Sequence, residues 1–288
     1  MEYMQGKVCL VTGSTSGIGR VTALELAKMG ATVVLACRDK SKGEATRDEI
    51  KAQNSDAAVD MLLADLSSQQ SVRQLAQDFK DRYSRLDVLL NNAGAIFLRR
   101  STTIDGFERT FAVNHLAPFL LTNLLLDTLK ASAPARVVTV SSGAHQGATI
   151  NFDDLQGEKG YRGLRAYGRS KLATILFTHE LAKRLQGTNV TANCLHPGTV
   201  ATNFGSDNGR VLSFLIKLFM RTGISPEKGA ETSIYLASSP EVEGVSGKYF
   251  SDCKETRSSK ESYDDAAAQR LWEVSAELTK VGNTGVSP

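Results

Sequence analysis

Short apolar runs alternate along the chain with longer stretches in which apolar residues recur at helical spacing. The apolar runs lack a strict polar–apolar alternation, so we expect strands that are buried on both faces. The segments predicted to contain strands are 7–12, 31–37, 57–66, 86–94, 135–142, 189–198 and a last one near 247–250. The segments predicted to be helical are 18–30, 41–53, 70–83, about 107–130, a helix that includes 167–171, one beginning at Pro226, and about 262–280.

This alternation indicates an α/β fold with parallel strands, because a chain that returns through a helix enters the next strand in the same direction. No internal repeat, low-complexity segment or linker interrupts the pattern, so we expect a single domain over residues 1–288. In sheets of this kind ligands bind beyond the carboxyl ends of the strands. The motifs considered below lie close to that edge.

Composition excludes several classes of protein. The chain is 41% hydrophobic and 23% charged, which suits a sizeable core and is not typical of a disordered protein. The net charge is only +3 and the basic residues are scattered, so we expect no nucleic-acid partner. The four cysteines are far apart, and the four histidines show no spacing typical of metal ligands. We therefore expect reduced thiols and no metal site.

The sequence shows no targeting or membrane-spanning segment. The start, "MEYMQ", lacks the basic and apolar regions of a signal, and we expect a cytoplasmic protein. The most apolar late stretch, 211–220, is interrupted by Lys217 and is too short to span a membrane. It is either a lid within a variable substrate region at about 201–225 or an interfacial helix that contacts a membrane. We favour the lid.

A glycine-rich turn, "TGSTSGIG", follows the first strand and opens the first helix. Gly13 lies at the tight turn, where a residue without a side chain lets the chain reverse. Gly17 and Gly19 lie at the helix start, where a pyrophosphate can approach backbone N–H groups and the positive end of the helix dipole. The spacing is G-x-x-x-G-x-G, and no G-K-[ST] follows as in a P-loop. The turn therefore favours a dinucleotide.

The end of the second strand bears on the choice between NAD and NADP. An acidic residue there accepts hydrogen bonds from the adenosine ribose, whereas a cation pairs with a 2′-phosphate. The position expected to face the ribose is Cys37, and Arg38 follows it. Arg20 can supply a second cation. We expect NADP(H), with NAD(H) as the alternative if Asp39 serves as the acid.

Two further strand ends carry polar or small residues. Asp65 ends the third strand, where it is expected to bond the adenine, to cap the helix that follows, or both. The turn "NNAG" (91–94) closes the fourth strand, and Ala93 and Gly94 leave space for a cofactor ribose.

Tyr167 and Lys171 stand four residues apart in "AYGRSK", before the apolar run "LATILF". Positions i and i+4 share one face of a helix, so the phenol and the ammonium lie side by side. Taken alone, the pair is typical of an ordinary helix surface. A tyrosine has a pKa of about 10, however, and a neighbouring cation favours the phenolate that a general base requires. Tyr161 has no lysine at i+4, because residue 165 is Arg165.

Together these motifs resemble the short-chain dehydrogenase/reductase superfamily. "TGSTSGIG", "NNAG", Asn114, "VSS" and "YGRSK" occur in the family's order. The glycine spacing resembles the simple oxidoreductases rather than the nucleotide-sugar epimerases, which usually show G-x-x-G-x-x-G. "FAVNHLAPFLLTNLLL", "VVTVSSGAH", "LHPGTVATN" and "LWEVS" are similar to the retinol-dehydrogenase-like reductases. The resemblance implies a Rossmann fold with about seven strands in the order 3-2-1-4-5-6-7.

The resemblance also implies roles. Tyr167 would be the acid/base, and Lys171 would bind the nicotinamide ribose and lower the pKa of Tyr167. Ser142, chosen over Ser141, would hydrogen-bond the substrate oxygen. Asn114 would hold a water in a proton relay to Lys171. Ser142 and Tyr167 are 25 residues apart, more than in minimal family members, which implies a loop beside the pocket.

The implied cofactor site has more members. The residues expected to contact the cofactor are Gly13, Ser14, Ser16, Gly17, Ile18, Gly19, Arg38, Asp65, Leu66, Asn92, Ala93, Gly94, Tyr167, Lys171, Pro197, Gly198, Val200 and Thr202.

The expected activity is NADP(H)-dependent hydride transfer to or from a ketone, aldehyde or alcohol of an apolar small molecule. The alternatives are an NADP(H)-binding redox sensor or scaffold and a peripheral membrane reductase of lipids. The complete Asn114, Ser142, Tyr167 and Lys171 set argues against a sensor. His145 and His196 do not make a serine hydrolase, because no G-x-S-x-G elbow occurs. A homodimer or homotetramer is expected from the resemblance alone.

Overall fold

The structure is a computed structural model and describes residues 4–198 and 223–281. One eight-stranded sheet organises it, in the order β3-β2-β1-β4-β5-β6-β7-β8. The strands are β1 (Val8–Thr12), β2 (Thr32–Cys37), β3 (Val59–Leu63), β4 (Val88–Asn91), β5 (Ala135–Val140), β6 (Val190–His196), β7 (Tyr249–Ser251) and β8 (Lys254–Glu255).

The order of β1 to β7 and their parallel pairing confirm the predicted doubly wound sheet. The sequence predicted about seven strands and missed β8. β8 has two residues and pairs antiparallel with β7, with Ser251 opposite Lys254. Asp252 and Cys253 form the turn between the two strands, and both have positive φ angles (50° and 59°). So short an exposed strand leaves no apolar run in the sequence, which is why the pattern missed it.

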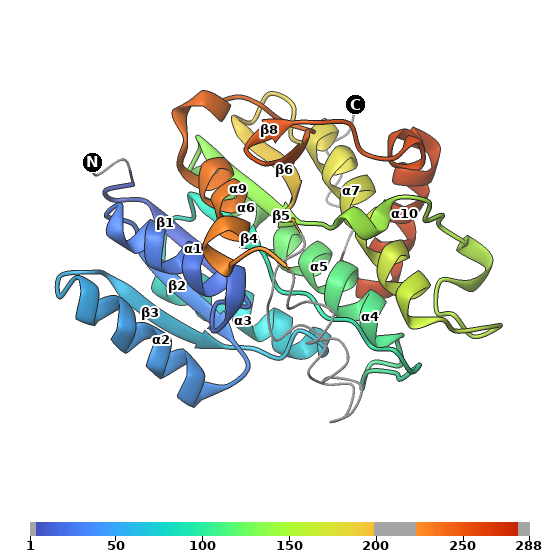
Figure 1. Cartoon of the computed structure of the whole chain (residues 1–288), viewed down its shortest axis with the longest axis horizontal. Coiled ribbons are helices and arrows are strands. Elements are labelled where there is room, and N and C mark those ends of the chain that lie inside the picture. Colours follow the sequence, from blue (N-terminus) through green and yellow to red (C-terminus); the bar gives the residue numbers. More distant parts are fainter. Residues whose placement is uncertain (1–3, 199–222, 282–288) are drawn as a thin grey trace.

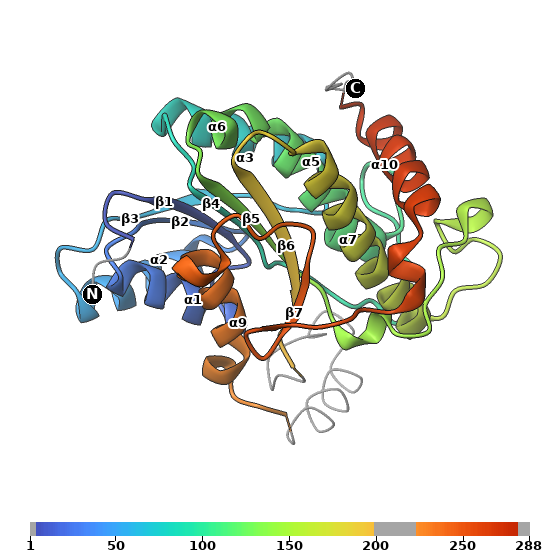
Figure 2. The ribbon, with the colours of Figure 1, turned by 90° about the horizontal axis from the view of Figure 1, so that it is seen from above.

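Helices cover both faces of the sheet (Figures 1 and 2). α1, α2 and α9 lie on one face, and α3, α5, α7 and α10 lie on the other. The longer helices are α1 (Gly17–Lys28), α2 (Lys40–Gln53), α3 (Gln69–Arg82), α5 (Ala117–Leu124), α7 (Gly163–Arg184), α9 (Pro226–Ser238) and α10 (Asp265–Thr279). The shorter ones are α4 (Arg109–Phe111), α6 (Leu126–Ala131), the π-helix η1 (Ala112–Leu116) and the 3₁₀ turns η2 (Gly143–His145), η3 (Phe152–Asp154), η5 (Pro240–Val242) and η6 (Lys260–Tyr263).

Each face of the sheet has its own apolar core. Leu10 and Phe119 belong to the core under α3, α5, α7 and α10, and Val11 and Leu35 belong to the core under α1 and α9. Neighbouring residues of one strand thus enter opposite cores, as the pleat requires. This explains why the strands are apolar at nearly every position. Burying each large side chain contributes about 1.5–3 kcal/mol.

Local signals set several helix boundaries as the sequence predicted. α1 ends one residue before Met29, and Gly30 follows with a φ of 91°. Glycine adopts this left-handed conformation without steric cost, so it terminates the helix. α9 begins at Pro226, which needs no hydrogen-bond acceptor for an N–H in the first turn. The Ser225 hydroxyl caps this helix by accepting a hydrogen bond from the Lys228 N–H.

The helix predicted at about 107–130 is not continuous. It consists of α4, the π-helix η1, α5 and α6, with a break at Leu125. In η1 the Ala117 N–H bonds the Ala112 carbonyl, five residues back, which widens the turn. The Asn114 carbonyl instead accepts a hydrogen bond from the Thr174 hydroxyl of α7 (3.4 Å). The bulge therefore depends on a neighbouring helix and was not visible in the local pattern.

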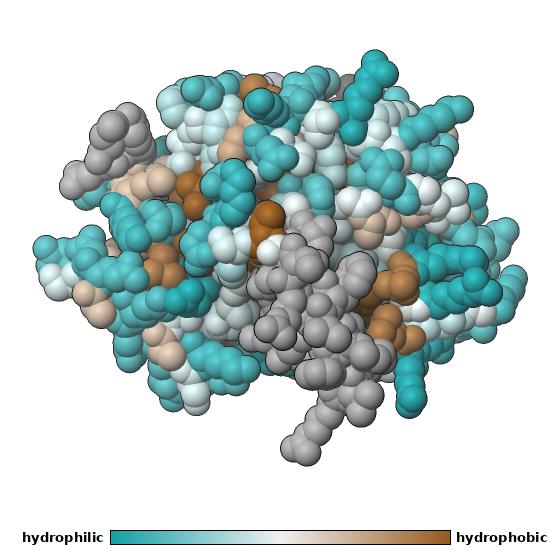
Figure 3. Space-filling model, viewed as in Figure 1, coloured by the Kyte–Doolittle hydropathy of each residue, from teal (hydrophilic) through white to brown (hydrophobic). Residues whose placement is uncertain are grey.

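The surface is mainly hydrophilic on the face shown in Figure 3, with apolar residues in small separate groups. In the described part of the chain, no helix combines the length and hydropathy needed to cross a membrane. Within the same ranges, no cluster of three histidine, cysteine or acidic residues is arranged as metal ligands would be.

Candidate active site

A cavity of about 610 Å³ follows the carboxyl ends of the strands. It runs from the turns after β1, β2 and β3, across the turn after β4, to the ends of β5 and β6 and the first turns of α7. The predicted site residues that line it are Gly13, Ser16, Gly17, Ile18, Gly19, Arg38, Asp65, Leu66, Asn92, Ala93, Gly94, Ser142, Tyr167, Lys171, Pro197 and Gly198.

Two of the predicted residues, Ser14 and Asn114, lie outside the cavity wall, and two others fall outside the described residues. Ser14 is fully buried, and its hydroxyl points to the Ala36 carbonyl (3.4 Å), so its neighbour Thr15 lines the cavity instead. Asn114 is buried behind the cavity wall. Val200 and Thr202 fall outside the described residues, as does most of the substrate region predicted at about 201–225.

The glycine turn is closed onto the turn after β4. A Cβ atom at Gly19 would overlap Asn92 Nδ2 and the Gly13 carbonyl oxygen. Asn92 Nδ2 donates to the Thr12 carbonyl (2.9 Å), and the Thr12 hydroxyl accepts from the backbone N–H of Asn92 (3.0 Å). Thr12 and Asn92 thus hold the two turns together, a role for Thr12 that the motif did not reveal. Glycine is required at position 19 by this close approach.

Helix α1 presents its N-terminus to the cavity. Ser16 occupies the N-cap position, but its side chain makes no capping hydrogen bond. Gly17, Ile18 and Gly19 begin the helix and line the cavity. Backbone N–H groups in a first turn have no partner within the helix, and the dipole there is positive. The arrangement suits an anion such as a pyrophosphate.

The four residues considered for cofactor choice differ in their surroundings. Cys37 and Arg38 line the cavity at the end of β2. Asp39 is exposed, and its carboxylate caps α2 by accepting from the Lys42 N–H (3.1 Å). Arg20 forms two hydrogen bonds to the Glu49 carboxylate and does not line the cavity. Arg38 is therefore the cation of this set that lines the cavity.

Asp65 combines a position in the cavity wall with a structural contact. Its Oδ1 accepts from the N–H (2.9 Å) and the hydroxyl (2.8 Å) of Ser67. The N-cap of α3 is Ser68, whose hydroxyl accepts from the Ser71 N–H (3.3 Å). Asp65 thus stabilises the turn before α3 without being its cap.

The two serines that follow β5 are oriented differently. Ser141 is buried, and its hydroxyl donates to the carbonyl of Lys171 (2.9 Å) on α7. Ser142 lines the cavity and forms a hydrogen bond with Tyr167. Its hydroxyl also accepts from the Ala144 N–H (3.2 Å). The geometry therefore favours Ser142 as the serine available to a substrate.

Tyr167 and Lys171 lie on the face of α7 that borders the cavity, and the ammonium is 5.7 Å from the centroid of the phenol ring. Burial raises the pKa of Tyr167 to about 12, and the hydrogen bond with Ser142 opposes this. Burial also lowers the pKa of Lys171 to about 8. Lys171 Nζ donates to the Val140 carbonyl (2.8 Å). In the protein alone, desolvation therefore outweighs the expected lowering of the tyrosine pKa by the lysine.

Asn114 lies on η1, with its side chain fixed against Ala95. Its Oδ1 accepts from the Ala95 N–H (2.8 Å), and its Nδ2 donates to the Ala95 carbonyl and to the Ser170 hydroxyl (both 2.9 Å). The Ser170 hydroxyl donates in turn to the Tyr167 carbonyl (2.7 Å). Asn114 thus connects the turn after β4 to the helix that carries Tyr167.

Gly168 and Arg169, which lie inside the Tyr167–Lys171 motif, also have structural roles. A Cβ at Gly168 would come within 2.6 Å of the Ala144 carbonyl oxygen, so glycine lets α7 approach the turn that follows Ser142. Arg169 Nη1 donates to the Asp154 carbonyl (2.7 Å) and anchors the loop before α7. A single sequence carries no signal for these contacts, because both partners are distant loop carbonyls.

Two histidines hold the turn that contains Ser142. His145 Nδ1 lies 2.7 Å from the Ser142 carbonyl, and its Nε2 accepts from the Ser259 N–H (3.0 Å). His196 Nδ1 accepts from the Gly143 N–H (3.0 Å). Burial lowers the pKa of both imidazoles, which suits their acceptor roles. Neither imidazole is arranged as the base of a serine hydrolase, because each binds backbone groups.

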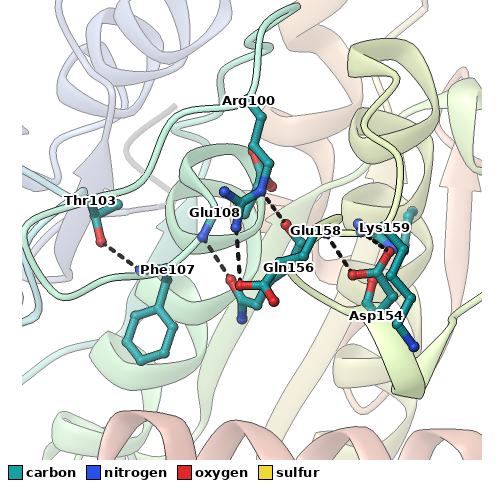
Figure 4. Close-up of polar contacts among 9 residues, drawn as sticks. Arg100, Thr103, Phe107, Glu108, Asp154, Gln156, Glu158 and Lys159 are labelled. Atoms are coloured by element: carbon teal, nitrogen blue, oxygen red, sulfur yellow. Dashed lines mark hydrogen bonds and ion pairs between the residues drawn. The ribbon is translucent and has the colours of Figure 1, made fainter.

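Tyr161 lies in a polar cluster beside the cavity. Its hydroxyl is 2.6 Å from the Phe97 carbonyl oxygen and 3.0 Å from Glu108 Oε1. Glu108 is fully buried, and its backbone N–H donates to Gln156 Oε1 (2.7 Å) (Figure 4). Burial and the nearby carboxylate raise the pKa of Tyr161 to about 12, although a hydrogen bond with Thr110 lowers it.

Known proteins are similar to this chain in sequence and in fold. The family model described as short chain dehydrogenase matches residues 7–210. The chain belongs to the short-chain dehydrogenase family. Retinol dehydrogenase 14 of Homo sapiens is 48% identical over 293 residues, which cover 94% of this chain and 86% of that protein. Retinol dehydrogenase 12 of Mus musculus is 50% identical over 273 residues, which cover 95% of this chain and 86% of that protein.

Solved structures are also similar to this chain. An uncharacterized protein from Mycobacterium paratuberculosis matches with a TM-score of 0.78 and 37% identity over 96% of this chain and 94% of that chain. RhlG of Pseudomonas aeruginosa, solved as an NADP active-site complex, matches with a TM-score of 0.69 and 28% identity over 86% of this chain and 96% of that chain. This short-chain dehydrogenase is therefore a retinol-dehydrogenase-like oxidoreductase that interconverts alcohols and carbonyl compounds.

Proposed function

We propose that this short-chain dehydrogenase transfers hydride between NADP(H) and a carbonyl or alcohol group of an apolar small molecule. The observation that carries the proposal is the placement of Ser142, Tyr167 and Lys171 at one end of a cavity whose other end has the glycine turn and Arg38. Phosphate-binding and proton-transferring groups thus border one continuous space.

The residues present fit a nicotinamide dinucleotide. The Gly13–Gly19 turn and the first turn of α1 would hold the pyrophosphate, because they line the cavity and the backbone N–H groups of a first turn have no partner within the helix. Lys171 would hold the nicotinamide ribose beside Gly94, where an added Cβ would lie 3.2 Å from Nζ. When bound, the cofactor supplies or accepts the hydride, and its oxidised form brings a positive charge.

The reaction requires the chain to orient the carbonyl oxygen and to deliver a proton to it. The Ser142 hydroxyl would donate a hydrogen bond to that oxygen, and the Tyr167 phenol would donate the proton. The Lys171 ammonium would stabilise the phenolate that remains. Asn114 positions Tyr167 through Ser170, and it would support a water that returns the proton to the site through Lys171.

The proposed preference for NADP(H) rests on Arg38. Asp39 caps α2, and Arg20 is paired with Glu49 and does not line the cavity. Arg38 lines the cavity at the end of β2, where it would meet a 2′-phosphate. We expect Arg38→Asp to lower the kcat/KM ratio of NADPH over NADH at least tenfold. Lys40→Asp changes the charge equally outside the cavity and should leave the ratio unchanged. A wild type that already prefers NADH would contradict the assignment.

The substrate end of the cavity favours an apolar molecule, because Ile96, Phe97 and Val113 line it. A screen of NADPH oxidation over ketones, aldehydes and quinones, with retinal included, tests the activity. We expect turnover of at least one carbonyl by the wild type. Tyr167→Phe should bind NADPH normally and lose turnover by about 10³-fold or more, because it removes the proton donor. NADPH binding without any turnover by the wild type would favour a redox sensor.

The remaining proposals rest on the sequence. They are a cytoplasmic location, assembly as a homodimer or homotetramer, and a lid at 211–220 that covers the substrate rather than contacting a membrane.

A further inference from the structure

Arg109 is a half-buried cation in the wall of the cavity that the proposed chemistry does not use. Its guanidinium carbon lies 4.5 Å from the centroid of the Phe97 ring. Within residues 4–198 and 223–281, no carbonyl or carboxylate accepts a hydrogen bond from this guanidinium. A guanidinium has five N–H donors, and burying them without acceptors is unfavourable.

Other arginines near this cavity have such partners. Arg100 donates to the Gln156 carbonyl (2.9 Å) and pairs with Glu158 (Figure 4), and Arg169 donates to the Asp154 carbonyl. The carboxylate next to Arg109 in sequence, Glu108, is already bound by the N–H groups of Thr110 and Phe111. The buried Glu108 carboxylate therefore points into the fold and does not pair with the guanidinium of Arg109. Among the described residues nothing accepts from the Arg109 guanidinium, so its donors can meet a molecule in the cavity.

Arg109 lies at the substrate end of this cavity. Its partner Phe97 packs against the start of α7, where a Cβ at Gly163 would meet the Phe97 carbonyl oxygen at 2.7 Å. Gly163 is about one helical turn before Tyr167. The glycine turn and Arg38 follow β1 and β2 instead, toward the other edge of the sheet. A group bound by Arg109 would therefore belong to the substrate rather than to a cofactor phosphate.

We propose that Arg109 binds a carboxylate of the substrate, so that the substrate class is an apolar aldehyde or ketone, or the matching alcohol, that carries a carboxylate. A carboxylate can accept two parallel hydrogen bonds from the planar guanidinium. The Phe97 ring fixes one face of that plane and packs against the apolar part of the substrate. This inference rests on the proposed oxidoreductase function and deepens it by naming the polar group of the substrate.

The first test compares acids with their neutral esters. The kcat/KM for NADPH-dependent reduction is measured for 4-carboxybenzaldehyde and 10-oxodecanoate and for the methyl ester of each. We expect the wild type to favour the acid at one of the two lengths. Arg109→Gln should lower kcat/KM for that acid about 10- to 100-fold, mainly through KM, and leave its ester within about threefold. Arg109→Lys should recover part of the loss.

The matched control is Arg99→Gln. Arg99 is exposed and is not part of the cavity wall, and the substitution removes the same charge from the loop that precedes α4. We expect this variant to keep the wild-type ratio of acid to ester. An equal loss in the Arg99 and Arg109 variants would indicate a general charge effect and would overturn the inference, as would a wild type that favours the esters at both lengths.

A binding measurement separates this inference from the proposed function. Titration calorimetry with decanoate and decanamide, in the presence of NADP⁺, requires no turnover. We expect decanoate to bind at least tenfold more tightly than decanamide in the wild type and in Arg99→Gln, but not in Arg109→Gln. Equal binding of the two would overturn the inference even if the esters are reduced. Binding that depends on Arg109, with no carbonyl turned over, would support the inference and contradict the proposed activity.

Discussion

Two half-buried phenols, Tyr161 just before α7 and Tyr167 near the start of that helix, have different surroundings. The hydroxyl of Tyr161 lies among acceptors, the Phe97 carbonyl and the Glu108 carboxylate, which favour a protonated phenol. Tyr167 faces Ser142, whose hydrogen bond lowers the tyrosine pKa, and the ammonium of Lys171 lies 5.7 Å from its ring. Burial raises the pKa of each to about 12.

The difference shows that burial alone does not distinguish an acid/base from a structural residue. Around Tyr161, the polar groups pair with one another, as Glu108 does with Thr110 N–H (2.8 Å). Around Tyr167, Lys171 is nearly inaccessible, and within the described residues its ammonium donates to the Val140 carbonyl. A buried cation beside a phenol is costly for stability and useful for proton transfer. The substitutions below test this contrast.

Among the substitutions that test this contrast, Lys171→Arg is expected to have the largest effect. The ammonium lies 2.8 Å from the Val140 carbonyl oxygen, and an added Cβ at Gly94 would come within 3.2 Å of it, so a planar guanidinium cannot occupy the same place. We expect kcat for any carbonyl reduced by the wild type to fall about 100-fold or more. Lys183→Arg, on the exposed part of the same helix, should keep wild-type kcat. Unchanged kcat in Lys171→Arg would remove the lysine from the mechanism.

A smaller effect, on stability rather than rate, is expected for Tyr161→Phe. The substitution leaves the Phe97 carbonyl without its phenol donor and removes one donor from the buried Glu108 carboxylate. We expect the free energy of unfolding in urea to fall by about 1–3 kcal/mol, with kcat within about threefold of the wild type. Tyr235→Phe, at a tyrosine whose hydroxyl donates to the exposed Glu241 carboxylate (3.1 Å), should change stability by less than about 0.5 kcal/mol. A 100-fold loss of kcat in Tyr161→Phe would contradict the purely structural role of Tyr161.

The smallest effect is a pH dependence at His115, which neighbours Asn114 on η1. Burial lowers the pKa of His115 to about 3, and its Nε2 lies 2.7 Å from the Ser275 hydroxyl. An unfolded histidine titrates near 6.5, so between these values the unfolded chain binds a proton that the folded protein does not. Stability should therefore fall as the pH drops below 6.5, by up to about 1.4 kcal/mol per pH unit from this residue.

His115→Gln should make that slope shallower by the same amount, because an amide does not titrate. The measurement is urea unfolding at pH 7.5, 6.5 and 5.5. His179→Gln provides the comparison, since the pKa of that partly exposed imidazole is also lowered by burial and a weaker change is expected. If the free energy of unfolding depends on pH equally in the wild type and in His115→Gln, the buried imidazole does not contribute to that dependence.

The sequence predicted the sheet and most helix boundaries because these depend on neighbouring residues. The alternation of strands and helices, the end of α1 before Gly30 and the start of α9 at Pro226 follow from local apolar periodicity and turn chemistry. The order of the strands was predicted from the family resemblance instead. The phosphate turn could be found in the same way, since Gly13 and Gly19 form one local motif with a fixed spacing.

The tertiary structure decided which of two similar neighbours faces the cavity. Thr15 replaces Ser14 because the Ser14 hydroxyl is turned toward β2, and Ser141 is directed to α7 while Ser142 borders the cavity. Arg20 is paired with Glu49 of another helix. Each outcome depends on a partner that is distant in sequence, so no local pattern records it.

The sequence by itself thus determined the fold class, the phosphate turn and the tyrosine–lysine face of α7, because each depends on the spacing of residues within one element or one turn. Only the tertiary structure decided the π-helix that carries Asn114, the close approach of Gly168 to the turn after Ser142, and the position of Arg109 in the cavity wall. The physical reason is that packing between helices, and burial of a charge without an acceptor, arise only when distant segments meet.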